Sequence, residues 1–266
     1  MCSSDLHGNA YAGWSQAYRP VIFKDLIPGS PLERVDKNLD DGRGYTLEAG
    51  YRGRTERLAW DVGVFELRYD NRMGTVAGFD ASGFYNLRTN IGDSRTRGAE
   101  LFVQHVWPLR GGRDLTAFTS TARLDGRYLD ATARVGTINV AVDGNRVQSV
   151  PDWISRSGFT LRAGRVSTTL LVSYTADSFA DARNTVLPSA NGAVGLVPAY
   201  TVVDFSASLE LTKNLSLRVS VNNLLDEQYF TKRPEFYPGP GVWPSDGRSV
   251  TASFRLMLPQ GGTLRR

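Results

Sequence analysis

The chain has 266 residues, of which 41% are hydrophobic and 11% aromatic, and its formal net charge is +4. No run of apolar residues approaches the roughly 18 that a membrane-spanning helix needs, which excludes helical membrane spans. Basic and acidic residues are mixed along the whole chain, which indicates a solvated surface and not a nucleic-acid-binding arm. The single cysteine, Cys2, excludes an internal disulfide and a metal site built from several thiolates.

The first residues, MCSSDLHG, lack the basic start, the apolar core and the cleavage site of a secretory signal. Residues 1–7 are therefore interpreted as an artificial start or as the start of a fragment. The alternative is a genuine short cytoplasmic protein.

A two-residue alternation of polar and apolar side chains predicts β-strands along the first two thirds of the chain. In residues 57–70 one face carries Phe65, Leu67 and Tyr69, and the other carries Glu66, Arg68 and Asp70. The strands expected in this part are about 8–18, 43–52, 57–70, 84–107, 114–128, 153–163 and 166–175.

The same alternation is clearest in the last third of the chain. Residues 203–211 and 215–222 form a predicted hairpin around a tight turn at Lys213 and Asn214, and a last strand is expected at 250–258. The whole chain thus reads as about ten strands with no amphipathic helix of convincing length.

Short and long connections take turns along this series of strands. Short links fall near 53–56, 108–113, 164–165 and 212–214, and long ones fall near 19–42, 71–83, 129–152, 176–198 and 225–247. Outer-membrane barrels have short periplasmic turns and long extracellular loops, whereas a soluble sandwich has no reason to gather its long loops at one end. Strands this long also exceed the usual five or six residues of soluble sheets.

Aromatic residues near the predicted strand ends fit the interfacial girdles of a membrane barrel. These residues are Trp14, Tyr18, Trp60, Tyr69, Trp107 and Tyr128. The polar side chains expected to face the interior of the barrel, with a structural role in its wall, are Glu66, Arg68, Glu100, Gln104, Asp204, Glu210, Arg218 and Arg255.

Several segments resemble successive barrel segments of TonB-dependent outer-membrane receptors. They are GWSQAYRPVIFKDLIPGS (13–30), GYTLEAGYRG with LAWDVGVFELRYDNRMGTV (44–76), NLRTNIGDSRTRGAELFVQ (86–104) and VNNLLDEQYFTKRPEFYPGPGVWPSDGRSVTASFRL (221–256). The stretch YPGPGVWPSDGRS is similar to the ferric dicitrate receptor group in particular. The chain departs from the family at its end, because it continues beyond Leu258 as PQGGTLRR where such barrels usually finish on an aromatic residue.

The resemblance implies an all-β fold, an antiparallel transmembrane β-barrel in the outer membrane of a Gram-negative bacterium. Complete receptors are 22-stranded with a plugged lumen, so residues 8–258 are expected to be the C-terminal, partial barrel, about ten strands with long extracellular loops, and 259–266 a tail. The implied function is energy-coupled uptake of a ferric chelate, either ferric dicitrate-like or another siderophore. The implied partners are the TonB energy-coupling complex, reached through an N-terminal plug and box, the outer-membrane lipid and the ferric chelate as transported ligand. No covalently bound cofactor and no nucleic acid are implied.

An anionic iron chelate calls for cationic and hydrogen-bonding side chains on the long loops, where they replace the hydration of its carboxylates. The candidates are Arg19, Lys24, Arg183, Asn184, Lys232, Arg233, Tyr237 and Trp243. For each of them, solvated loop charge or a strut between loops is the competing interpretation.

The sequence does not indicate an enzyme. It has no Gly-x-Ser-x-Gly elbow, and the segment GPGVWPSDG lacks the lysine of a phosphate-binding loop. Neither histidine supports a catalytic or metal site, since His7 lies in the suspect N-terminus and His105 is expected at the membrane interface beside Trp107. Two other hypotheses stay open: a self-contained passive outer-membrane channel and a soluble β-sandwich binding module.

Overall fold

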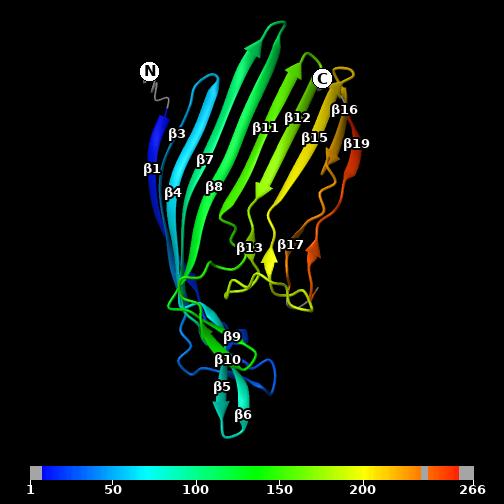
Figure 1. The fold of residues 1–266 in the computed structure, drawn as a ribbon. Coiled ribbons are helices and arrows are strands. Elements are labelled where there is room, and N and C mark those ends of the chain that lie inside the picture. Colours follow the sequence, from blue (N-terminus) through cyan, green and yellow to red (C-terminus); the bar gives the residue numbers. More distant parts are fainter. Residues whose placement is uncertain (1–7, 235–238, 258–266) are drawn as a thin grey trace, which may run out of the picture.

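The computed structural model describes residues 8–234 and 239–257, and its main feature is one ten-stranded antiparallel sheet (Figure 1). The strands lie side by side in the order in which they occur in the chain, and within the described residues the outer two, β1 and β19, each pair with one neighbour. The strands are β1 (Gly8–Arg19), β3 (Gly42–Arg54), β4 (Leu58–Asp70), β7 (Asp93–Leu109), β8 (Arg113–Leu129), β11 (Trp153–Ala163), β12 (Val166–Thr175), β15 (Tyr200–Glu210), β16 (Leu215–Asn222) and β19 (Ser249–Leu256). All ten expected strands are present, although the predicted extension of the last one to Leu258 lies outside the described residues.

The connections alternate in length, as the sequence predicts. Short turns at 55–57, 110–112, 164–165 and 211–214 lie at one end of the sheet, here called the turn end. Long segments at 20–41, 71–92, 130–152, 176–199 and 223–248 lie at the opposite end, here called the loop end (Figure 1). Since long and short links take turns, every long loop is brought to the same end of the sheet.

The long loops carry short elements of their own. These are α1 (Phe23–Leu26), β2 (Glu33–Val35), β5 (Met73–Asp80), β6 (Gly83–Asn90), β9 (Thr132–Val135), β10 (Ile138–Ala141), β13 (Ser178–Phe179), β14 (Leu196–Val197), β17 (Phe230–Lys232) and β18 (Trp243–Pro244). Strand β2 pairs in parallel with β6, which joins the first long loop to the second. The hairpins β5–β6 and β9–β10 project beyond the sheet (Figure 1).

One predicted strand, 84–107, is wrong as a single element. The structure divides it into β6, which belongs to the projecting hairpin, and β7, which belongs to the main sheet. The chain turns at Gly92, whose φ of 127° is unfavourable for other residues, and a Cβ there would lie 2.4 Å from the Cα of Ala131. Because the segments on both sides of Gly92 are extended, their alternation does not reveal the break.

The register divides the side chains of the sheet between two faces. The polar face carries residues such as Tyr11, Glu100, Ser206 and Arg218. The apolar face carries large hydrophobic side chains that are strongly exposed, among them Val64 (57%), Phe159 (57%), Leu170 (38%), Val250 (68%) and Phe254 (70%). In a soluble sandwich a second sheet would cover such a face. No other sheet in the described part of the chain covers it, so sandwich packing is excluded for these residues.

Two of the side chains predicted to face the interior, Glu66 and Arg68, are wrongly assigned. By register Glu66 pairs with Leu47 and Arg97 and thus lies on the apolar face near the loop end, as does Arg68. The other six lie on the polar face: Glu100, Gln104, Asp204, Glu210, Arg218 and Arg255. The alternation in β4 is real, but the strand extends beyond the apolar belt, where the chemistry of the two faces is reversed.

Three of the six aromatic residues predicted near strand ends lie there on the apolar face: Tyr18, Trp60 and Trp107. Trp14 lies on the same face but in the middle of β1. His105 stacks on Trp107 with ring centroids 4.4 Å apart. Tyr69 and Tyr128 lie on the polar face instead. Tyr128 belongs to a small buried cluster with Ala131, Val142 and Val147 at the loop end of the sheet.

Within the described residues, no helix has both the length and the apolar character needed to cross a membrane.

Candidate ligand pocket among the long loops

A cavity of about 730 Å³ lies at the loop end and is lined by residues of the first four long loops and of β8. It is called the loop pocket here. Its polar lining comes from residues far apart in the sequence: Glu33, Arg72, Thr75, Asn86, Tyr128, Thr132, Arg134, Gln148, Asp181 and Arg183. The alternating connections and the hairpin β5–β6 bring these residues together, because each lies on or beside a loop at the same end of the sheet.

Arg72 is the most firmly held cation of the loop pocket. Its backbone N–H donates to the carbonyl of Gly92 (2.8 Å) and its Nη1 donates to the Ser94 hydroxyl (3.0 Å). The guanidinium carbon lies 5.1 Å from the ring centroid of Tyr69 and 5.6 Å from that of Tyr128. Such cation–π contacts orient the guanidinium and leave its charge uncompensated. Among the described residues no carboxylate lies within 4.0 Å of it.

The second free cation of the loop pocket is Arg134, on β9. Its Nη1 donates to the carbonyl of Gly136 (2.8 Å), and in the described part of the chain it too has no carboxylate partner. Arg183 differs, because its Nη2 lies 3.4 Å from Oδ2 of Asp181. The loop pocket therefore holds one arginine that is already paired and two that are oriented only by neutral partners.

The two acids of the loop pocket are occupied by other partners. Glu33 forms an ion pair with Arg88. Asp181 accepts hydrogen bonds from the Thr185 hydroxyl (2.6 Å) and the Thr185 backbone N–H (3.0 Å). Since both carboxylates are engaged within the loops, Arg72 and Arg134 remain the groups available to an incoming anion.

Seven of the eight residues that the sequence suggests for binding lie in the described part of the chain, and of these seven only Arg183 lines the loop pocket. Asn184, next to it, is a strut: its side chain accepts from the Arg146 N–H (2.7 Å) and donates to the Arg146 carbonyl (2.8 Å). Arg19 pairs with Asp25 (3.1 Å). Lys24 is exposed on α1, where its carbonyl accepts from the Arg88 side chain (2.8 Å).

The candidates of the last long loop lie elsewhere. Arg233 donates to the carbonyls of Leu196 (3.0 Å) and Gly192 (2.9 Å) and so braces the fourth long loop against the fifth. Lys232 is exposed and pairs in register with Trp243, whose ring is half-exposed. Tyr237 lies outside the described residues. The strut interpretation therefore describes Asn184 and Arg233 well.

Arg72 and Arg134 are not among the candidates from the sequence, which lie on the first, fourth and fifth long loops. Arg72 lies at the start of the predicted loop 71–83 and Arg134 lies within 129–152. The available signal was their position on long loops at the same end of the predicted barrel. Nothing in the local sequence distinguishes them from other loop arginines.

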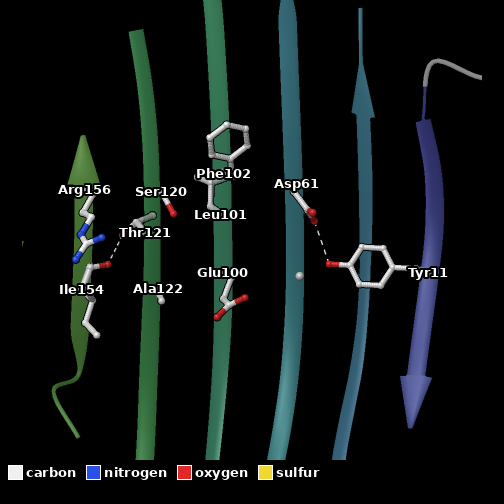
Figure 2. A pocket seen from close by; sticks show the side chains of 11 residues that line it. Tyr11, Asp61, Glu100, Leu101, Phe102, Ser120, Thr121, Ala122, Ile154 and Arg156 are labelled. Atoms are coloured by element: carbon white, nitrogen blue, oxygen red, sulfur yellow. Dashed lines mark hydrogen bonds between the residues drawn. The ribbon is translucent and has the colours of Figure 1, made fainter. Parts of the chain in front are cut away.

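A second, smaller cavity of about 360 Å³ lies on the polar face of the sheet, away from the loops. Figure 2 shows its lining, in which the Tyr11 hydroxyl donates to Asp61 (3.0 Å), while Glu100 projects from β7 and Arg156 from β11. Acidic and basic groups are mixed over this shallow stretch of wall. It therefore offers no single type of charge for an anion and is the weaker ligand site.

No group of three or more His, Cys, Asp or Glu side chains in residues 8–234 and 239–257 is placed to hold a metal ion.

The comparisons with known proteins agree with this architecture. Residues 4–224 match the model of the family described as TonB dependent receptor-like, beta-barrel. The chain belongs to this family. Its curated relatives include the probable TonB-dependent receptor BfrD of Bordetella pertussis, 26% identical over 94% of this chain and 31% of the relative. The heme transporter BhuA of Brucella abortus is 28% identical over 92% of the chain and 35% of the relative. The chain thus spans about a third of the length of the curated relatives that it matches.

Solved structures of the family share the fold of this chain. The unliganded ferric citrate transporter FecA superposes with a TM-score of 0.76 at 18% identity, over 94% of this chain and 36% of that one. The siderophore receptor PiuA from Acinetobacter baumannii superposes with a TM-score of 0.67 at 21% identity, over 94% of this chain and 34% of that one. Since the sheet matches about a third of each receptor, this TonB-dependent receptor chain forms part of a barrel.

Proposed function

We propose that this chain is part of a receptor that imports an anionic ferric chelate across the outer membrane, and that the chelate is a carboxylate-rich one of the ferric dicitrate type. The observation that carries the proposal is the loop pocket, in which Arg72 and Arg134 are oriented but have no carboxylate partner among the described residues. The family membership supports uptake of iron or another metal complex as the class of function.

The chemistry of the loop pocket favours a carboxylate ligand. A guanidinium presents a planar set of donors that matches a carboxylate in two parallel hydrogen bonds. Arg72 keeps part of this donor set free, because its contacts on two sides are aromatic rings. The neighbouring Gln148, Thr75 and Thr132 add neutral donors that could bind the remaining oxygens of a chelate.

Transport by this mechanism needs binding and gating and makes no bond. The loops bind the chelate more tightly in one conformational state than in another, and this difference drives the step that admits it. The plug that closes the lumen and the TonB energy-coupling complex are the partners that we propose for the complete receptor. The proposed location is the outer membrane of a Gram-negative bacterium, with the loop end outward.

The test uses the full-length parent protein in a host that lacks its own ferric citrate receptor. We expect the parent to restore growth on ferric citrate and uptake of radioactive iron from it. Absence of rescue with normal amounts at the cell surface would remove the dicitrate proposal. Rescue by heme or by another siderophore in the same host would redirect it. Uptake that persists in a host without TonB would favour the passive channel.

Variants of the loop pocket test the site itself. Arg72→Gln and Arg134→Gln each remove a charge-assisted contact, so the chelate concentration for half-maximal uptake should rise roughly tenfold or more. Arg110→Gln, in an exposed turn at the opposite end of the sheet, is the matched control and should leave uptake unchanged. Equal uptake by all three variants would show that the chelate binds elsewhere.

A further inference from the structure

Near the loop end of β3, β4, β7 and β8, the side chains on the apolar face change from hydrophobic residues to arginines. On β7 the apolar side chains run from Leu109 to Ala99 and are followed by Arg97 and Arg95. On β4 they end at Val64, and Arg68 follows Glu66. The arginines on this part of the face are Arg43, Arg68, Arg95, Arg97, Arg123 and Arg127, here called the arginine band.

Two tryptophans mark the level at which the arginine band begins. Trp153 on β11 is the register partner of Arg123. Trp14 on β1 lies in the same cross-strand row as Arg97, through Leu47 and Glu66. Tryptophan side chains on a membrane barrel prefer the boundary between hydrocarbon and headgroups. The arginine band therefore lies directly on the headgroup side of that boundary.

Three arginines of the band stand side by side. Arg68 pairs in register with Arg95, and Arg95 pairs with Arg127, so three adjacent strands present guanidinium groups on one face in one row. Like charges directly opposite one another on neighbouring strands destabilise a sheet unless something compensates them.

The acids near the arginine band compensate only some of these charges. Asp93 and Asp70 accept from Arg68 (3.0 and 2.5 Å), Glu66 accepts from Arg97 (2.6 Å) and Tyr45 (2.8 Å), and Asp125 accepts from Arg127 (2.6 Å). Asp41 accepts from Tyr18 and from the Val21 N–H. Among the described residues, Arg43, Arg95 and Arg123 have no carboxylate within 4.0 Å.

We infer that the arginine band binds the phosphate groups of anionic lipid headgroups in the leaflet at the loop end. The apolar belt places the band at headgroup depth, and Arg95 and Arg123 offer donors that match phosphate oxygens. A lipid phosphate over the row would compensate the charge that Arg68, Arg95 and Arg127 share. This site lies on the face opposite to the polar face and is separate from the loop pocket, so it does not depend on which chelate is imported.

The experiment is native mass spectrometry of the full-length parent in neutral detergent, titrated with phosphatidic acid. We expect the double variant Arg95→Gln/Arg123→Gln to bind this lipid roughly tenfold or more weakly than the parent. The matched control is Arg110→Gln/Arg113→Gln, which removes the same charge at the turn end and should retain the tight binding. Arg95→Lys/Arg123→Lys should retain most of it, because the charge is kept.

Two further measurements cover the case in which the double variant does not fold. Heat-modifiable mobility on a gel reports whether each variant is folded, and Arg43→Gln, at an exposed position without a carboxylate partner, should weaken lipid binding even if the double variant fails to fold. Unchanged lipid binding in the folded variants would overturn the inference. The inference would also be overturned if inorganic phosphate alone bound to the arginine band as tightly as phosphatidic acid does, because the site would then bind a free anion.

Discussion

Glycines and aromatic rings face one another across neighbouring strands on the polar face of the sheet. Phe65 is the register partner of Gly98, and Phe118 is the register partner of Gly158. A Cβ built on Gly98 would lie 2.4 Å from Cζ of Phe65, so the ring occupies the space that a side chain would need. Because glycine has no side chain, the aromatic ring of its partner residue can lie close to the backbone of the neighbouring strand on the polar face.

Gly98→Ala is therefore expected to destabilise the barrel. The added methyl group forces the Phe65 ring to move, and such overpacking costs about 1–3 kcal/mol. The measurement is the temperature at which the full-length parent loses its heat-modifiable mobility. In a Phe65→Ala background the same change should cost much less, because the ring is gone. An equal loss in both backgrounds would mean that the ring is not the cause.

A single buried carboxylate organises the first long loop. Burial by itself raises the pKa of Asp25, but hydrogen bonds from the Ile22 N–H and the Arg19 guanidinium hold that pKa below its usual range. A depressed carboxylate pKa contributes stability that is present above the unfolded-state pKa of about 4 and is lost as the pH falls through the folded-state pKa. The first long loop should thus loosen in acid.

Asp25→Asn tests this pH dependence. Hydrogen exchange of residues 20–35, corrected for the intrinsic pH effect, should be faster than in the parent near about pH 7, and the difference should shrink below about pH 4. Asp40→Asn, at an exposed acid of the same loop without an ion pair among the described residues, is the control and should show no such difference. A difference that stays constant with pH would contradict the electrostatic explanation.

At the scale of elements, the long loops are held to one another by side chains that bond to backbone. Asn223 is buried and accepts from the Glu227 N–H (2.8 Å), while Arg233 bonds to the fourth long loop near β14. Buried or partly buried backbone groups need partners, and loops of this length cannot supply them all from strand ladders. Arg233, a ligand-binding candidate in the sequence, thus connects the fifth long loop to the fourth.

Arg233→Ala should release this brace. Loss of the two bonds to the Leu196 and Gly192 carbonyls, each worth roughly 1.5–3 kcal/mol when the donor is charged, should speed hydrogen exchange of residues 192–197. Lys232→Ala, the exposed neighbour, should leave that exchange unchanged. If chelate uptake falls in Arg233→Ala while hydrogen exchange of residues 192–197 stays the same, Arg233 binds the ligand and does not hold the two loops together.

At the scale of the whole molecule, the sheet has one face for lipid and one for a watery interior. Leu170 and Leu171 are neighbours in β12, yet by register Leu170 lies opposite Phe159 and Phe205 on the apolar face and Leu171 lies opposite Gly158 and Asp204 on the polar face. The two positions therefore report on the two faces with the same residue type in the same strand.

Leu170→Arg should destabilise the folded receptor by about 2–4 kcal/mol, the cost of a charged side chain on the lipid side near the middle of the membrane, and Leu171→Arg should cost clearly less. The amount of folded receptor recovered in urea titrations with lipid vesicles measures both. Equal costs would mean that the exposed apolar face does not meet hydrocarbon, and the membrane assignment would fail with it.

The alternation of residues along the chain is enough to predict ten strands, although one of them includes a separate hairpin strand, and to predict the order of long and short connections. Alternation such as that of Val203 to Leu211 depends only on the two-residue period of a strand. The tertiary structure decided the rest. The register of the sheet shows that Glu66 and Arg68 face away from the interior, and the backbone turns at Gly92 between β6 and β7. Packing of the long loops brings Arg72 and Arg134 into one cavity. The two-residue period shows that a strand has two different faces. Only the pairing between strands shows which residues lie on the same face, and only contacts between distant loops show which residues line the same cavity.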